Sequence, residues 1–302
     1  MSLFKPKVLF SLLYDAAQGL TRDYGSVHSA ALGYYILLSI FPLATLSAII
    51  ITRIVGPTAL TGEYEDLLSN VVGGQYSGMI QNLITNNYAI ATNTVWTILN
   101  ILILIYASSY MFYQARISLD AMWHLTPKPG VKNSLLATVK TYSLAYLVAL
   151  LVGLSFLALL FFNTAINMFS NLIQNKFNLD FSTIQPLINI SASPIIYAGI
   201  FLIAFRYLPQ AKARFVDLFP GALLTAILYW AGNYLYSIYL SFGSSSSIYG
   251  VASSMVFFLF WLYYSAMIFL YGAKFTGLYV TRYGQGFTPH FNMMIEQIPK
   301  TE

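Results

Sequence analysis

The residues able to do acid–base or nucleophilic chemistry are few and scattered along this chain. Its three histidines, His28, His124 and His290, lie far apart and form no His-x-His motif. The densest acidic group lies within residues 63–66, and cysteine is absent. Hydrolytic or nuclease chemistry needs a paired acid and base, or a cluster of metal ligands. We therefore expect no catalytic residues, no metal site and no cofactor, and a protein that is not an enzyme.

A second set of residues has the chemistry to bind an anion. Arg116 and Asp120 are four residues apart, so they share one face of a helix. Arg206, Lys212 and Arg214 follow a long apolar stretch. Because a guanidinium can hold a phosphate through two hydrogen bonds, these five residues are the candidate contacts for a ligand or lipid headgroup. The alternative is that the basic side chains only reach ordinary anionic lipids.

A third set lies within apolar stretches and could form a cavity or a hinge. Pro42 and Pro194 should kink their helices, because proline cannot donate to the carbonyl four residues earlier. In a membrane, backbone groups freed in this way must be satisfied by protein or line a wet cavity. Asn233 and Ser265 add polar side chains, for which ordinary hydrogen bonding between helices is the alternative. The candidate cavity or hinge residues are Tyr35, Ser39, Pro42, Asn100, Pro194, Tyr249 and Gly250.

The elements that position these residues are membrane spans. Only 8% of the residues are charged, 58% are hydrophobic and the mean hydropathy is +0.66, whereas a soluble domain carries roughly 25% charged residues. About 20 apolar residues suffice for a helix to cross the hydrocarbon core. The sequence therefore predicts an all-α polytopic membrane protein with six transmembrane helices. The predicted spans cover about residues 29–52, 94–113, 141–162, 181–205, 218–240 and 251–273.

Lysine and arginine fall on alternate sides of these spans. The side of the two termini receives 13 of the 15 basic residues, and the other side receives only Arg53 and Lys176. Because basic loops stay inside, both termini are predicted to be cytoplasmic. Residues 1–27 then form an amphipathic cytoplasmic segment, 28–281 the membrane domain and 282–302 a cytoplasmic tail. Two semi-apolar loops between spans are predicted to be external.

Several short motifs carry a resemblance to a known family. Residues 28–43 read HSAALGYYILLSIFPL, and further motifs follow in order: Leu208-Pro209, Phe219-Pro-Gly-Ala-Leu223, Ile248-Tyr-Gly250, Trp261-Leu-Tyr-Tyr-Ser265 and Tyr271-Gly-Ala273. The chain resembles the YihY/BrkB family of bacterial inner-membrane proteins, historically mislabelled as ribonucleases. The resemblance implies a multi-pass protein of the bacterial cytoplasmic membrane. The family usually has an Asn-Arg-like pair after the second helix, where this chain has Asp120-Ala-Met-Trp123.

Three functions follow as hypotheses. We expect a transporter or flippase-like protein for an amphipathic, anionic lipid or envelope precursor, because the spans carry kinks and basic residues lie at their inner ends. The predicted spans contain no Asp or Glu, which argues against a conventional proton- or sodium-driven carrier. A non-transporting scaffold for envelope integrity is the alternative, and a membrane-embedded enzyme is the third hypothesis. The expected partners are membrane lipids, with a homo-oligomer also open, and no nucleic acid.

Overall fold

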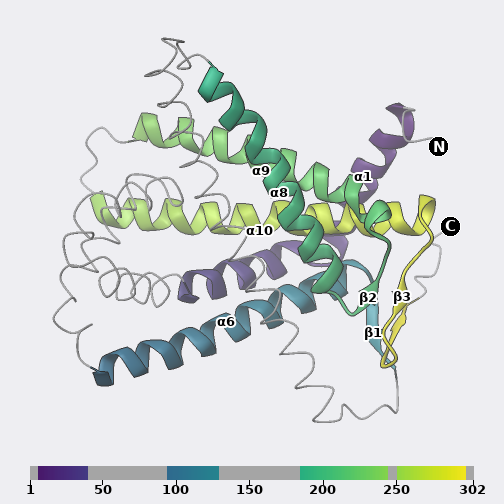
Figure 1. Cartoon of the computed structure of the whole chain (residues 1–302), viewed down its shortest axis with the longest axis horizontal. Coiled ribbons are helices and arrows are strands. Elements are labelled where there is room, and N and C mark those ends of the chain that lie inside the picture. Colours follow the sequence, from purple (N-terminus) through teal and green to yellow (C-terminus); the bar gives the residue numbers. More distant parts are fainter. Residues whose placement is uncertain (1–5, 40–93, 129–183, 244–249, 297–302) are drawn as a thin grey trace, which may run out of the picture. The chain divides into compact units, whose positions relative to one another are not determined.

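Long helices make up most of the chain that the computed structural model describes, which comprises residues 6–39, 94–128, 184–243 and 250–296 (Figure 1). An α-helix bonds its own backbone N–H and carbonyl groups, as a membrane-spanning segment must. The predominantly helical prediction is thus confirmed. The helices are α1 (Pro6–Arg22), residues 25–39, α6 (Thr94–Met122), α8 (Ile184–Tyr207), α9 (Phe215–Gly243) and α10 (Gly250–Tyr283).

Four predicted spans coincide with described helices: residues 94–113 with α6, 181–205 with α8, 218–240 with α9 and 251–273 with α10. Within the described residues, two segments are long and apolar enough to cross a membrane, Phe215–Tyr236 and Val256–Tyr283. At 29 and 34 residues, α6 and α10 are about 44 and 51 Å long. Both are longer than the roughly 30 Å thickness of a hydrocarbon core.

The other parts of the span prediction lie outside the described residues. These are the second half of the first span, the span at 141–162 and both external loops. The beginning of the first span, up to residue 39, is helical.

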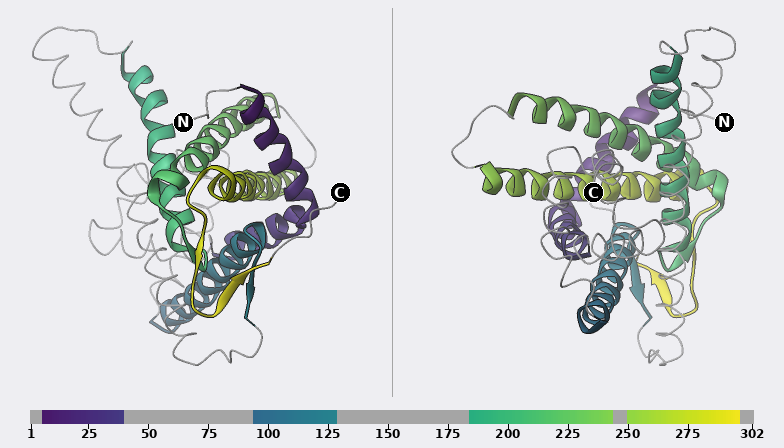
Figure 2. Two further views of the ribbon diagram at one scale, coloured as in Figure 1. Left: turned by 90° about the vertical axis from the view of Figure 1, so that its right-hand side faces the viewer. Right: turned by 60° about the vertical axis from the view of Figure 1, so that its left-hand side comes forward.

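Four short strands accompany the helices and correct the prediction of an all-α chain. Strand β1 (Leu125–Pro127) pairs antiparallel with β4 (Met293–Ile295), and β2 (Ala211–Lys212) pairs antiparallel with β3 (Thr288–Pro289). Figure 2 shows the C-terminal segment, in yellow, alongside β1. Strands of two or three residues leave no period-two pattern in a sequence. Through them, the residues predicted as a tail hold the chain just after α6 and just after α8.

The chain divides into two compact units, each with its own apolar core. The first contains Met1–Ser29, Ala115–Tyr234 and Ser265–Glu302, and the second contains Ala30–Gln114 and Leu235–Tyr264. In the first unit, α1 buries Leu12 and Ala16 against Phe275 and Tyr279 of α10. In the second unit, Phe258 and Leu262 of α10 pack with Ile36 and Leu37. The amphipathic N-terminal helix therefore docks one apolar face onto the protein itself.

Helices α9 and α10 cross through a reciprocal pair of glycines and threonines in the first unit. Thr225 Oγ1 donates to the carbonyl of Gly221 at 2.7 Å, and Thr276 Oγ1 donates to the carbonyl of Gly272 at 2.6 Å. A Cβ added to Gly221 would overlap the Thr276 side chain, and one added to Gly272 would overlap Thr225. Small residues let two helix backbones approach closely in a membrane. Each glycine thus accommodates the threonine of the other helix.

Candidate functional site

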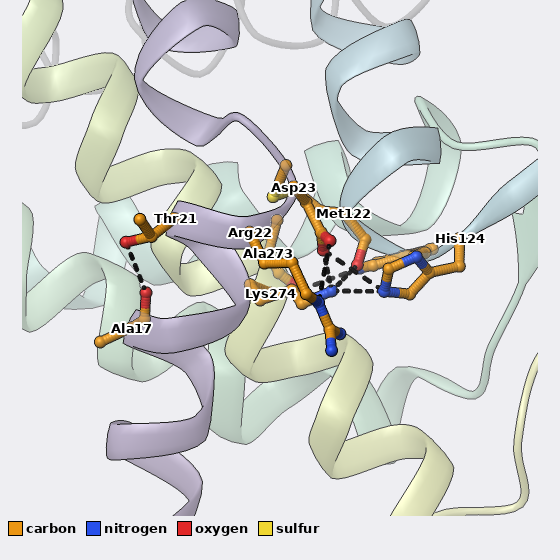
Figure 3. A network of polar contacts seen from close by, with 9 residues as sticks. Ala17, Thr21, Arg22, Asp23, Met122, His124, Ala273 and Lys274 are labelled. Carbon is orange, nitrogen blue, oxygen red and sulfur yellow. Dashed lines mark hydrogen bonds and ion pairs between the residues drawn. The ribbon is translucent and has the colours of Figure 1, made fainter. Parts of the chain in front are cut away.

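Lys274 of α10 lies at the centre of a polar cluster that joins three distant chain segments (Figure 3). Its side chain is only 3% exposed, and its ammonium donates to the Asp23 carboxylate, which follows α1. The same ammonium donates to the carbonyl of Met122 at 3.0 Å and lies 2.7 Å from Nε2 of His124, both at the end of α6. Buried charges must be paired and hydrogen-bonded. We call these four residues the cap cluster.

The cap cluster requires a neutral His124. A lysine ammonium has donors only, so the facing Nε2 must be an unprotonated acceptor. Nε2 also lies 3.3 Å from the Asp23 carboxylate. Burial and the neighbouring Lys274 charge lower the pKa of His124, and Asp23 opposes them. His124 is placed by a left-handed backbone turn (φ 53°) after α6, and its carbonyl accepts the N–H of Glu296 at 2.9 Å.

Trp123 secures the same end of α6 on α10. Its indole Nε1 donates to the carbonyl of Ala273 at 2.8 Å, and its ring stacks on Phe287 with centroids 4.4 Å apart. A Cβ on Gly277 would lie 2.8 Å from the indole Cδ1, so only glycine fits beside the ring. Trp123, the last residue of the motif Asp120-Ala-Met-Trp123, therefore has a structural role here.

Asp120 connects α6 to the chain that follows α8. Its carboxylate accepts the backbone N–H of Gln210 at 2.8 Å and the Gln210 amide at 3.0 Å. Arg116, one turn earlier, lies 3.8 Å from the same carboxylate. Burial raises the pKa of Asp120 to about 6, although the bonds from Gln210 and the charge of Arg116 oppose that rise. Asp120 thus pairs with Arg116 and accepts two hydrogen bonds from Gln210.

The three remaining predicted headgroup contacts surround the connection from α8 to α9. The guanidinium of Arg206 donates to the carbonyl of Ala213 and lies over the ring of Phe215, 4.9 Å from its centroid. Lys212 in β2 and Arg214 before α9 have exposed side chains. The five predicted contacts therefore divide into an internal pair, two exposed cations and the partly buried Arg206 beside them.

Two predicted cavity residues, Tyr35 and Ser39, lie together in the second unit. Ser39 Oγ donates to the carbonyl of Tyr35 at 2.9 Å, and Tyr35 stacks on Tyr110 of α6 at 5.7 Å between centroids. Tyr106 continues this row of phenols at 4.7 Å from Tyr110. Asn100 lies in α6, and Gly250 begins α10. Pro42 and Tyr249 lie outside the described residues.

A cluster of neutral polar side chains lies on three helices of the first unit. Asn233 of α9 hydrogen-bonds the hydroxyls of Tyr197 of α8 and Tyr229 of α9, and Tyr229 also bonds Ser265 of α10. The two tyrosine rings are 5.1 Å apart in an edge-to-face arrangement. All four residues are partly exposed, but the hydroxyl of Tyr229 is enclosed by protein. We call these four residues the midspan cluster.

The helices give the distance from the midspan cluster to the next charged residue on α10 and on α8. Ser265 lies nine residues before Lys274, and Tyr197 lies nine residues before Arg206, which is about 14 Å along an α-helix. A hydrocarbon core of roughly 30 Å has its middle at that depth from its edge. Pro194 lies inside α8, one turn before Tyr197, and leaves the carbonyl of Ile190 without its usual helical partner. Ser265 and Tyr197 therefore lie about half the thickness of a hydrocarbon core before the charged residues Lys274 and Arg206.

Sequence reasoning missed the cap cluster. Lys274 and Asp23 are 251 residues apart, and each looks like an ordinary charge at a helix end. One signal was available. Lys274 directly follows an uncharged stretch that begins after Asp217, and a charge buried at the end of such a stretch needs an oppositely charged partner. Across the described ranges, no three His, Cys, Asp or Glu side chains gather as metal ligands would.

Comparison with known sequences places the chain. The sequence model of a protein family described as "Virulence factor BrkB" matches residues 16–290. The chain belongs to this family. The resemblance to the YihY/BrkB family is thereby confirmed, as is a location in the bacterial inner membrane. The matched range includes α6, α8, α9 and α10 and every residue of the cap cluster and the midspan cluster.

Known relatives of this BrkB-family chain are distant in sequence. A UPF0761 membrane protein of Psychromonas ingrahamii is 23% identical over 277 residues, covering 90% of this chain and 88% of the relative. A UPF0761 membrane protein of a Psychrobacter species is 22% identical, covering 88% of this chain and 47% of the relative. One of Azotobacter vinelandii is 21% identical, covering 83% and 59%. The chain thus spans about half the length of two of these relatives. No solved structure matches it.

Proposed function

We propose that the chain crosses the membrane six times, with both termini and the cap cluster in the cytoplasm. Four chain segments support this topology, because they meet although the sequence separates them. The end of α1 and the end of α6 both contact Lys274 of α10, and the chain after α8 contacts Asp120. Segments that meet in this way lie on one side of the membrane, which requires an even number of crossings between them. The charge bias assigns that side to the cytoplasm.

We further propose that the protein is a non-enzymatic transporter that moves an amphipathic, anionic lipid or envelope precursor between leaflets. The midspan cluster is the observation that carries this proposal. Moving a polar headgroup through hydrocarbon exposes it to a large desolvation cost. The hydroxyls and amide of Tyr197, Tyr229, Asn233 and Ser265 offer hydrogen bonds at the depth where that cost is greatest. Tyr197, Asn233 and Ser265 are partly exposed, which would let a headgroup reach the cluster from their side.

The neutrality of the midspan cluster favours a lipid over an ion-coupled solute. Proton- and sodium-coupled carriers generally place a carboxylate at midplane, and the predicted spans have none. Tyrosine also combines an apolar ring with a polar hydroxyl, which suits a molecule that is part headgroup and part acyl chain. Cations at the cytoplasmic ends of α8 and α9 would favour an anionic headgroup on that side.

Translocation is tested with the purified protein in liposomes that carry fluorescently labelled phospholipids. Dithionite destroys the label in the outer leaflet only, so lipid movement appears as additional loss of fluorescence. The proposal predicts faster loss than in empty liposomes, greatest for anionic headgroups, and slower movement after Asn233→Leu. Gly199→Ala, on the exposed side of α8 with open space around it, is the matched control. An unchanged rate for every headgroup would contradict transport and favour the scaffold.

A further inference from the structure

Two exposed cations, Lys212 and Arg214, lie in the connection between α8 and α9. From Ala211 to Arg214 the side chains alternate between buried and exposed, with both alanines buried and Lys212 and Arg214 exposed. Alternation of this kind puts residues i and i+2 on the same face, about 6.6 Å apart along the strand. Pairing of β2 with β3 fixes the backbone of Ala211 and Lys212, and the carbonyl of Arg214 accepts the backbone N–H groups of Asp217 and Leu218 at the start of α9. Lys212 and Arg214 therefore project together from one face.

A third cation is held beside these two. The guanidinium of Arg206 donates to the carbonyl of Ala213, the residue between Lys212 and Arg214, and is held over the ring of Phe215. A guanidinium has five N–H donors, so one bond to a carbonyl leaves others for a ligand. The nearest acid along the chain, Asp217, turns its carboxylate to the backbone N–H of Gln285 at 3.3 Å. Among the described residues, no ion pair engages Lys212 or Arg214.

An exposed apolar stripe begins directly below these cations. Val216, Phe219, Leu223 and Ile227 of α9 are all exposed, with Val216 at 78%. Their spacings of three, four and four residues place them on one face of the helix. Tyr207 packs edge-to-face on Phe215 at the top of this stripe. Cations next to a strip of apolar side chains are complementary to a phospholipid, which joins a phosphate to acyl chains.

We propose that Lys212, Arg214 and Arg206 bind the phosphate of an anionic phospholipid whose acyl chains lie along Val216, Phe219, Leu223 and Ile227. Charge complementarity selects this occupant: a net-anionic headgroup gains from all three cations, whereas the ammonium of a zwitterionic headgroup is repelled by them. Arginine adds bidentate geometry for phosphate. The inference rests on the proposed function, in that it names where an anionic lipid is held at the cytoplasmic end of the transport path.

Binding is measured separately from transport, in detergent, by native mass spectrometry with phosphatidylglycerol or phosphatidylethanolamine as the probe. A basic residue near a membrane surface contributes roughly fivefold in affinity for anionic lipid. Lys212→Gln/Arg214→Gln should therefore weaken phosphatidylglycerol binding by roughly 30-fold and leave phosphatidylethanolamine binding nearly unchanged. The matched control is Lys7→Gln/Lys128→Gln, which removes the same charge at two other exposed positions and should leave both lipids within about twofold.

The apolar half of the site has its own test. Phe219→Asn should weaken both lipids, since it interrupts the stripe without changing charge. Equal losses in the two double variants would show diffuse surface charge and overturn the proposal. So would competition by soluble glycerol 3-phosphate as effective as that by the lipid, because the site would then need no acyl chains. Intact selective binding in a protein that does not accelerate lipid movement would contradict the transport proposal alone.

Discussion

The ammonium of Lys274 lies 2.7 Å from Nε2 of His124, so a buried lysine uses a neutral imidazole as one of its acceptors. Asp23 supplies the countercharge, and the carbonyl of Met122 is the third partner. This arrangement joins the end of α1, the end of α6 and the last third of α10. Any change in the charge of one member alters the pairing of the others.

Removal of the Lys274 ammonium should strongly destabilise the protein. Lys274→Met leaves the Asp23 carboxylate with its buried partner missing, and breaking a buried pair from one side costs about 3–5 kcal/mol. The free energy of unfolding is measured in mixed micelles as the fraction of SDS is raised. Lys7→Met, at an exposed position of α1, should change it by less than about 0.5 kcal/mol.

The double variant Asp23→Asn/Lys274→Met distinguishes a pair from two independent effects. Neither charge is then left alone, so the double variant should lose less stability than the sum of its two single variants. Additive losses would mean that Asp23 and Lys274 act independently.

Acidification should loosen the cap cluster through His124. Burial and Lys274 lower the pKa of His124 below its ordinary value of 6.5, so the unfolded chain binds the proton more readily. The contribution of His124 to the free energy of unfolding is therefore fully present above pH 6.5 and decreases as the pH drops below that value. Melting temperatures recorded across this range should show the fall, and His124→Gln should reduce it. Burial also lowers the pKa of His28, so His28 contributes its own decrease in stability at low pH. In His28→Gln, the decrease in melting temperature that is due to His124 should remain.

Asp120 should have the opposite dependence on pH. Its pKa rises to about 6 when the protein folds, so the folded state keeps the proton over a range in which the unfolded state has released it. The contribution of Asp120 to stability therefore decreases as the pH rises from about 4 to about 6 and is constant above that. The carbonyl infrared band of a protonated carboxyl should disappear with a midpoint near pH 6 and be missing in Asp120→Asn. A band that disappears near pH 4 would show an ordinary carboxylate.

The crossing of α9 and α10 should tolerate no added methyl group. Gly221→Ala places a Cβ on the Thr276 side chain, and overpacking of this kind costs about 1–3 kcal/mol. Gly199→Ala is the matched control, because nothing lies within 4 Å of the added Cβ, and it should be neutral or stabilising. Thr276→Gly should restore part of the stability of Gly221→Ala. No recovery would mean that the added methyl group is not opposed by Thr276.

The sequence predicts the helices well and their polar contacts poorly, for physical reasons. Long apolar stretches are local signals, and four predicted spans coincide with α6, α8, α9 and α10. Arg116 and Asp120, one helical turn apart, were predictable as neighbours for the same reason. Lys274 and Asp23 meet only after the chain folds, and the short strands near residues 125 and 294 depend on a partner strand rather than on their own pattern.

Both the lipid path and the lipid site require the cap cluster to face the cytoplasm, and cysteine accessibility tests this most directly. The chain has no cysteine of its own, so single cysteines report one position each. In intact spheroplasts, a membrane-impermeant maleimide should label Thr61→Cys and Asn175→Cys in the predicted external loops. It should leave Tyr24→Cys and Phe291→Cys, both highly exposed beside the cap, unlabelled until the membrane is permeabilised. Labelling of Tyr24→Cys and Phe291→Cys in intact spheroplasts would contradict the account.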